Sequence, residues 1–255
     1  MKLIRMHRQE EHSDIAVPGV DVRSVTALVL AGGLGTRLRP LTGDLPKALA
    51  PVAGRPFLAY VLLYLHDQAI SDVVVCTGYG GEKVAEYCGS GARWGVRIRC
   101  SRETRPLGTA GAIKNAEELI GSDPFFVMNG DSLVRADLAR LIELHQMKRA
   151  RISMVLVEVE DQMRFGSVLL GEGDSILGFN EKGRNGPGFI SAGVYLFERS
   201  VLETIPTGEN VSVEQDVFPR FVNKRFYGMK VPGPFIDIGT PNSYALAQMA
   251  LGSSQ

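Results

Sequence analysis

The sequence lacks any apolar run long enough to cross a membrane. The longest, Phe57 to Leu65, is far shorter than the roughly 20 residues that a membrane-spanning helix needs. The first residues, MKLIRMHRQEEH, are interrupted by charged side chains and contain no apolar core of a secretory signal peptide. We therefore expect a cytoplasmic protein that does not bind membranes.

The sequence has no excess of charge of either sign. Its 28 Lys and Arg residues balance its 28 Asp and Glu residues, so no overall field favours nucleic acid or an anionic membrane. Any anion must therefore be bound by a local group of cations. With 255 residues, of which 45% are hydrophobic and 22% charged, the chain can form the core of a globular protein.

Cysteine and histidine are scarce and lie outside recognisable motifs. Cys76, Cys88 and Cys100 are odd in number and never spaced as CxxC, which argues against structural zinc, so we expect reduced, buried thiols. His66 and His145 lie in predicted helices, where a packed or solvated histidine is expected rather than a ligand. Without a Ser/His or Cys/His pair in a motif, we expect direct displacement rather than covalent catalysis.

From residue 25 onwards, strands and helices alternate. The strands are predicted at 25–31, 72–77, 95–100 and 125–128, and the helices at 56–70, 81–87, 109–120 and 137–148, with Thr109 and Asp137 as helix caps. This alternation predicts a Rossmann-like three-layer α/β/α fold with a mixed, mostly parallel sheet. Ligands should bind beyond the carboxyl ends of the strands.

The second half of the chain changes character. It predicts strands at 151–159, 190–197, 226–231 and 235–238, a hairpin of 165–170 with 176–180, and helices at 213–223 and 241–251. We interpret it as a small β insertion within a single catalytic domain, 25–251. Residues 1–24 show no clean periodicity and are predicted to be a mobile extension, in which 15–22 could form a short extended piece.

The stretch 28–51, LVLAGGLGTRLRPLTGDLPKALAP, predicts a strand that opens into a phosphate-binding loop. Its glycines lack a Cβ, so backbone N–H groups can approach a polyphosphate closely. Arg37 and Arg39 supply guanidinium donors suited to phosphate oxygens, and Lys47 adds a cation. The stretch contains neither GxxxxGK[ST] nor GxGxxG. By itself it could also be a glycine-rich turn with solvated arginines.

Two aspartates are candidates for a metal site. Asp131 directly follows a predicted buried strand, in MNGDS, and Asp237 lies in the apolar segment FIDIGTP. A carboxylate between two isoleucines needs a partner, because an unpaired buried charge is costly. For either residue alone, a turn or N-cap aspartate is an equally good interpretation.

The segments GGLGTRLRPLT at 32–42 and PKALAPVAGRP at 46–56 resemble the sugar-phosphate nucleotidyltransferase family, and the resemblance extends from residue 25 to about 250. Members of this family join a nucleoside triphosphate to a sugar 1-phosphate and release pyrophosphate. The resemblance therefore implies an enzyme that uses Mg²⁺. It also implies that the β insertion binds the sugar.

The resemblance assigns roles to particular positions. It implies a nucleotide site formed by Leu30, Ala31, Gly32, Gly33, Gly35, Thr36, Arg37, Leu107, Gly108 and Thr109. Tyr79 is added to this site from its position, because 76–79 end the second predicted strand and can form a second wall of the base pocket. It implies a sugar site formed by Gly166, Glu181, Lys182, Ser191 and Gly193. It implies catalytic roles for Arg37, Lys47, Asp131, Lys182 and Asp237, of which Asp131 and Asp237 hold the metal. Phe165 stands where many relatives have tyrosine, and a lone Glu-Lys pair is usually a solvated surface pair.

Within the family, several segments are most similar to the D-glycero-α-D-manno-heptose 1-phosphate guanylyltransferases, which make GDP-heptose for bacterial lipopolysaccharide and capsule. These segments are FGSVLL, GFNEKG, FISAGVYLF, SVEQDVFPRF and FIDIGTPNSY. Only 18 residues follow Asp237, so we expect a short member without an added C-terminal domain. The implied partners are GTP and a sugar 1-phosphate.

Three alternatives stay open: a mannose 1-phosphate guanylyltransferase, an N-acetylmuramate 1-phosphate uridylyltransferase and a catalytically silent nucleotide-sugar sensor. The sequence does not place the groups that would read guanine. It also leaves open whether copies of the chain form a homo-oligomer.

Overall fold

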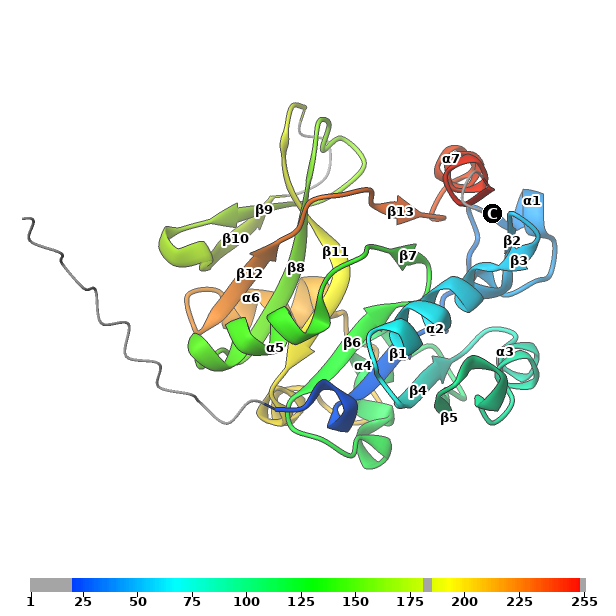
Figure 1. Ribbon diagram of the computed structural model, residues 1–255, viewed down its shortest axis with the longest axis horizontal. Coiled ribbons are helices and arrows are strands. Elements are labelled where there is room, and N and C mark those ends of the chain that lie inside the picture. Colours follow the sequence, from blue (N-terminus) through cyan, green and yellow to red (C-terminus); the bar gives the residue numbers. More distant parts are fainter. Residues whose placement is uncertain (1–19, 181–184, 253–255) are drawn as a thin grey trace, which may run out of the picture.

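The computed structural model describes residues 20–180 and 185–252. They build a nine-stranded mixed sheet in the order β10-β9-β11-β6-β1-β4-β5, in which β8 pairs with β11 and β12 pairs with β8 (Figure 1). Its strands are β1 (Thr26–Leu30), β4 (Asp72–Thr77), β5 (Arg97–Arg102), β6 (Phe125–Asn129), β8 (Ile152–Val159), β9 (Ser167–Leu170), β10 (Ile176–Asn180), β11 (Gly188–Phe197) and β12 (Phe226–Lys230).

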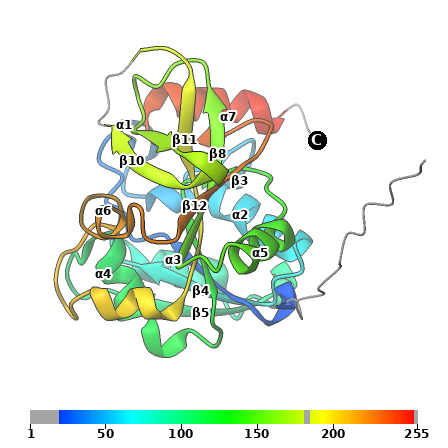
Figure 2. The same cartoon turned by 90° about the vertical axis from the view of Figure 1, so that its left-hand side faces the viewer.

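Helices cover both faces of this sheet, as the sequence predicts. In β1, Ala27 and Val29 belong to one hydrophobic core and Leu28 to the other, because successive side chains of a strand point to opposite faces. Figure 2 shows α2 and α5 on one side of the strands and α4 and α6 on the other. The helices are α1 (Arg39–Thr42), α2 (Phe57–Asp67), α3 (Gly81–Cys88), α4 (Gly108–Asn115), α5 (Leu138–Met147), α6 (Phe218–Phe221) and α7 (Pro241–Gly252).

The parallel part of the sheet sets the position of the site. β1 pairs in parallel with both β4 and β6, and β4 with β5, so the four strands end at one edge. After β1 the chain adds β4 and β5 on one side and then returns to place β6 on the other. This reversal of strand order at β1 is the switch point where open α/β sheets bind ligands.

β11 carries the insertion past the end of β6. It runs antiparallel to β6, and its register with β8 shifts between Ser191 and Tyr195. Gly193 lies in this irregular stretch with φ +72°, and a Cβ there would come within 2.6 Å of Asn129 Nδ2 and 2.7 Å of Ser132 Oγ. Glycine therefore lets β11 pass closely over the carboxyl end of β6.

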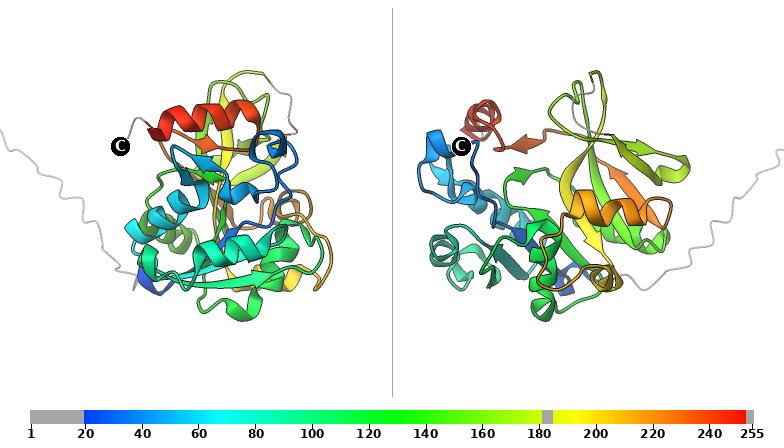
Figure 3. Two further views of the ribbon diagram at one scale, coloured as in Figure 1. Left: turned by 90° about the vertical axis from the view of Figure 1, so that its right-hand side faces the viewer. Right: turned by 180° about the vertical axis from the view of Figure 1, so that it is seen from behind.

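A second ladder brings the two candidate aspartates together. β7 (Ser132–Leu133) pairs with β13 (Ile236–Asp237), and Ile238 N donates to Asp131 O at 3.0 Å. α7 follows β13 and packs beside the hairpin of β2 (Pro51–Val52) and β3 (Arg55–Pro56), where Gln248 Nε2 donates to Pro51 O at 2.8 Å (Figure 3). α7 thus holds β13 beside the β2–β3 hairpin.

Two helices differ from the prediction. α4 begins at Gly108 and ends at Asn115, and Thr109 does not cap it, because the Thr109 hydroxyl accepts a hydrogen bond from Val213 N at 2.8 Å. The helix predicted at 213–223 divides into a π-helical turn, Val213–Val217, and α6. Pro219 lacks the N–H that a regular helix would use there, which accounts for the change.

One cysteine also differs from the prediction. Cys76 and Cys88 are buried and free, whereas Cys100 is free but exposed. Cys100 lies in β5, the last strand of the sheet, and among the described residues no further strand pairs with β5. The expectation of three buried thiols is therefore wrong for Cys100.

The start of the described chain is ordered before residue 25. Val22–Ser24 form a 3₁₀ turn capped by Asp21, whose carboxylate accepts from Arg23 N at 3.0 Å. Most of the predicted extension, and most of the segment 15–22, lies outside the described residues. Across the two described ranges, no helix is both long and apolar enough to span a bilayer.

Because His145 is buried, we predict that the folded protein loses stability in mild acid. It is 5% exposed in α5, and its Nδ1 lies 2.9 Å from Ser153 Oγ. Burial lowers the pKa of His145 to about 4, so the unfolded chain binds a proton that the folded chain rejects. Stability is thus fully present above the unfolded pKa of about 6.5 and falls as the pH drops towards 4.

Urea unfolding should therefore give a free energy about 2 kcal/mol lower at pH 5 than at pH 7.5 from this residue. His145→Gln should remove that part of the pH slope. An identical slope in the variant would contradict the assignment.

Candidate active site

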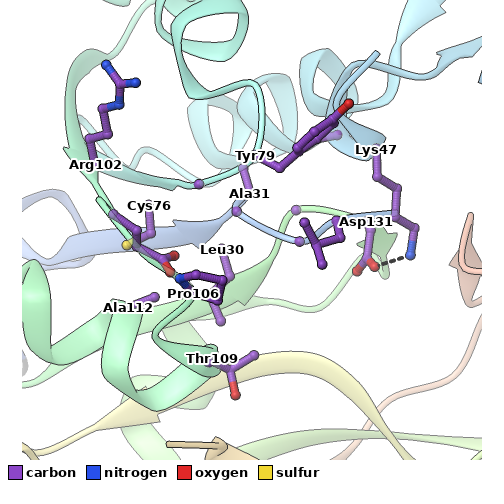
Figure 4. A pocket seen from close by; sticks show the side chains of 18 of the residues that line it. Leu30, Ala31, Lys47, Cys76, Tyr79, Arg102, Pro106, Thr109, Ala112 and Asp131 are labelled. Atoms are coloured by element: carbon purple, nitrogen blue, oxygen red, sulfur yellow. Dashed lines mark hydrogen bonds and ion pairs between the residues drawn. The ribbon is translucent and has the colours of Figure 1, made fainter. Parts of the chain in front are cut away.

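A cavity of about 620 Å³ opens at the carboxyl ends of β1, β4, β5 and β6. Figure 4 shows Lys47 and Asp131 joined at one end of it and Cys76, Pro106 and Ala112 at the other. Predicted site residues among its lining are Leu30, Ala31, Gly32, Gly33, Tyr79, Gly108, Thr109, Lys47 and Asp131. Gly35, Thr36, Arg37 and Leu107 are predicted nucleotide residues that do not line it.

The loop after β1 presents its backbone to this cavity. Within the described part of the chain, the backbone N–H groups of 32–37 donate to no other residue. A Cβ at Gly32 would lie 2.7 Å from Glu103 Oε1 and 3.1 Å from Gly78 N, so a larger residue there would press on the Glu103 carboxylate and on the backbone after β4. Gly35 has φ +59° and packs on the Lys47 side chain. The loop is therefore shaped to offer N–H groups to an anion.

The other end of the cavity holds a carboxylate that the sequence analysis missed. Glu103 follows β5, and its Oε2 accepts from Leu107 N at 2.9 Å. Burial raises the pKa of Glu103, and the Leu107 N–H partly offsets the rise. The sequence contains one sign of its role: like Asp131, Glu103 lies just beyond the carboxyl end of a predicted strand. The sequence analysis assigned nucleotide binding to the nearby segment 107–109 instead.

Asp131 lines the polar end of the cavity, whereas Asp237 does not line it but lies beside it, paired across the β7–β13 ladder with Ser132. Lys47 Nζ donates to Asp131 Oδ2, and the Lys47 side chain is only 12% exposed. Asp237 Oδ1 accepts from Gly239 N and Ser243 Oγ, both at 2.8 Å. The sequence-based expectation that Asp237 needs partners is therefore confirmed.

Two cations besides Lys47 lie near these carboxylates. Arg164 Nη2 is 3.2 Å from Asp237 Oδ2, and Arg37 Nη2 is 3.8 Å from the point where a Cβ at Gly239 would be. Arg39 is held at the rim, where its Nη2 donates to Tyr79 OH at 2.6 Å. Positive side chains thus surround two carboxylates, which suits phosphates and a metal together.

The residues at this end fit a divalent cation that arrives with a nucleotide. In the ranges that the structure covers, no three His, Cys, Asp or Glu side chains gather as a closed metal cage. Mg²⁺ commonly takes one or two carboxylates and completes its shell with phosphate oxygens and water. Asp131, in the turn before β7, and Asp237, in the paired strand β13, each face a cation already and are such a donor set.

Three of the predicted sugar residues, Gly166, Ser191 and Gly193, lie beyond Asp131 on the side of β9 and β11. Ser191 Oγ is 2.9 Å from Tyr195 OH and accepts from Gly193 N at 3.2 Å. Gly166 directly precedes β9, which pairs with β11 through Ser167 and Ile190. Their roles stay predictions. Glu181 and Lys182 lie outside the described residues.

A family model described as "Nucleotidyl transferase" matches residues 26–254. The chain is 38% identical to a D-glycero-alpha-D-manno-heptose 1-phosphate guanylyltransferase of Aneurinibacillus thermoaerophilus, over 88% of this chain and 97% of that protein. It is 40% identical to a mannose-1-phosphate guanylyltransferase of Mycobacterium tuberculosis, over 86% of this chain but only 62% of the relative.

Solved structures agree with the sequence relatives. HddC from Yersinia pseudotuberculosis, crystallised with GMP-PN, is similar with a TM-score of 0.80 and 33% identity, over 89% of this chain and 99% of that chain. The predicted fold class is therefore confirmed, together with the resemblance from which the site residues were taken. This chain belongs to the nucleotidyl transferase family.

Proposed function

We propose that this protein transfers a guanylyl group from GTP to D-glycero-α-D-manno-heptose 1-phosphate, giving GDP-heptose and pyrophosphate. The observation that carries the proposal is the order of groups along the edge of the sheet. Glu103 after β5 lies at one end, the loop after β1 comes next, Asp131 after β6 follows, and β11 with β9 completes the row. Base, triphosphate, metal and sugar would occupy this edge in that order.

The reaction needs positioning and charge neutralisation rather than a protein nucleophile. A phosphate oxygen of the sugar attacks the α-phosphorus of GTP, and the bond from that phosphorus to the oxygen bridging to the β-phosphate breaks. The electron pair leaves with pyrophosphate, whose charge Arg37 and Lys47 neutralise. Asp131 and Asp237 would hold Mg²⁺, which supplies positive charge at the α-phosphate when bound.

Glu103 supports guanine as the base. The Watson–Crick edge of guanine carries two adjacent donors, N1–H and N2–H₂, and an ionised carboxylate only accepts. Oε2 already accepts from Leu107 N, and Oε1 receives no hydrogen bond from another described residue. Uracil and adenine do not offer two adjacent donors. Guanine is therefore the base that this carboxylate fits best.

The sugar end supports the rest of the proposal. Gly166, Ser191 and Gly193 would surround the sugar, while Glu181 and Lys182 would contact its hydroxyls and phosphate. The resemblance to heptose enzymes over nearly their full length favours heptose 1-phosphate. The 40% identity to a mannose-1-phosphate guanylyltransferase keeps mannose 1-phosphate as a second candidate. We place the reaction in the cytoplasm, where the enzyme would have access to nucleoside triphosphates.

The test is pyrophosphate release by the purified protein with Mg²⁺. GTP, UTP, dTTP, CTP and ATP are each paired with the 1-phosphates of the heptose, mannose, glucose and N-acetylmuramic acid. We expect release with GTP and the heptose 1-phosphate above all other pairs. Release with mannose 1-phosphate instead would change the substrate and keep the mechanism. No release with any pair, together with tight binding of nucleotide sugars, would favour a silent sensor.

A further inference from the structure

Arg164 joins the β insertion to Asp237, one of the two proposed metal ligands. It lies in the loop between β8 and β9, 73 residues before Asp237 in sequence, and its Nη2 is 3.2 Å from Asp237 Oδ2 and 3.4 Å from Oδ1. The Arg164 side chain is 39% exposed and that of Asp237 only 17%. The guanidinium is therefore open to solvent on one side and meets a partly buried carboxylate on the other.

Neighbouring side chains hold this loop in place. Gln162 is 5% exposed, and its amide donates to Pro187 O at 2.6 Å and Gly186 O at 3.2 Å, which ties the loop to the chain before β11. Phe165 packs edge-on against Phe235, with ring centroids 5.7 Å apart. The Arg164 guanidinium carbon lies 5.1 Å from the centre of the Phe165 ring. Little further ordering is needed for Arg164 to bind a ligand here.

The Arg164 guanidinium has N–H donors that are not used within the described residues. Only its Nη2 donates to Asp237, and no other residue in the described ranges accepts a hydrogen bond from it. Asp237 does not depend on Arg164 alone, because Gly239 N and Ser243 Oγ also donate to it. A guanidinium with free N–H groups matches the geometry of a phosphate, which it binds through two parallel hydrogen bonds.

The position of Arg164 indicates which phosphate it would meet. Lys47 follows the loop after β1, on the side of the triphosphate, whereas Arg164 is two residues before Gly166 on the side of β9 and β11. In an in-line displacement, the attacking phosphate and the departing pyrophosphate lie on opposite sides of the α-phosphorus. Arg164 is therefore on the side of the attacking group.

We propose that Arg164 binds the phosphate of the incoming sugar 1-phosphate, and that its ion pair with Asp237 holds the guanidinium ready beside the metal site. This inference rests on the proposed function. It adds a cation to the sugar side whose position, unlike that of Lys182, the structure describes. Arg164 becomes a substrate ligand that also links the sugar loop to Asp237.

The test is calorimetric binding of mannose 1-phosphate and of the heptose 1-phosphate, with Mg²⁺ and a GTP analogue whose α,β-bridging oxygen is a methylene. Arg164→Gln should weaken binding of the sugar 1-phosphate by about 10- to 100-fold, as expected for the loss of hydrogen bonds to a charged group. Affinity for the GTP analogue should stay within about twofold. Arg164→Lys should recover part of the loss, because it restores the charge without the planar fork.

Arg140→Gln is the matched control, because Arg140 is also an exposed arginine beside an aspartate, Asp137, at 3.7 Å, but lies on α5. It should bind both ligands as the wild type does. Unchanged affinity of Arg164→Gln for the sugar 1-phosphate would overturn the proposal. Equal weakening of the GTP analogue and the sugar 1-phosphate would also overturn it, in favour of a role in holding Asp237. A wild-type protein that binds the GTP analogue but neither sugar 1-phosphate would overturn the proposed function itself.

Discussion

Asp131→Asn should lower kcat by at least about 1,000-fold while the protein still folds and still binds GTP without metal. The amide keeps an oxygen that can accept from Lys47, so the contact at the end of the cavity survives. It loses the negative charge that a divalent cation requires, and metal-assisted charge stabilisation contributes several kcal/mol to such reactions.

Pyrophosphate release measures turnover, and fluorescence of a labelled GTP in EDTA measures binding without metal. Asp174→Asn is the matched control, because Asp174 is also a half-exposed aspartate paired with a lysine, Lys230, at 2.7 Å. It lies between β9 and β10, away from the cavity, and its replacement should leave kcat unchanged. Full turnover in Asp131→Asn would remove the metal assignment. Loss of GTP binding in EDTA would instead give Asp131 a role in building the site.

Much of the fold could be predicted because its signals are local. The run at 72–77 matches β4 residue for residue, and Asp137 caps α5 by accepting from Arg140 N at 3.1 Å. Thr109 shows where local reasoning ends. It has the residue type of a helix cap, but its hydroxyl accepts a hydrogen bond from the backbone N–H of Val213, 104 positions later. A tertiary hydrogen bond of that kind leaves no trace in the neighbouring residues.

The same limit applies to the site. The glycine loop and Asp131 could be placed because each directly follows a strand end, and parallel strands bring such ends together. The Lys47–Asp131 and Arg164–Asp237 pairs could not be predicted in this way. Their partners are 84 and 73 residues apart in sequence, so each pair depends on how distant loops meet in the fold. Glu103 met the same criterion as Asp131. The sequence does not single it out, because a lone glutamate after a strand does not reveal which base it would face.

Glu103→Gln should lower kcat/KM for GTP by about 100-fold and remove most of the preference for GTP over ITP. The carboxylate would accept from both N1–H and N2–H₂ of guanine, and a site built to bind such donors strongly rejects a base without them. The glutamine amide replaces one acceptor by a donor that would face a donor of the base. ITP lacks the N2 amine, so it should lose less.

The ratio of the two kcat/KM values separates base reading from a structural role of Glu103. Its Oε2 accepts from Leu107 N, just before α4, and the glutamine oxygen can keep that bond, so the helix should still start at Gly108. If Glu103 only supported α4, GTP and ITP would lose activity equally. Glu117→Gln is the control, because Glu117 is a half-buried glutamate paired with Lys114 at 2.7 Å, near the other end of α4. It should leave the ratio unchanged, and a wild-type ratio in Glu103→Gln would assign guanine recognition to another group.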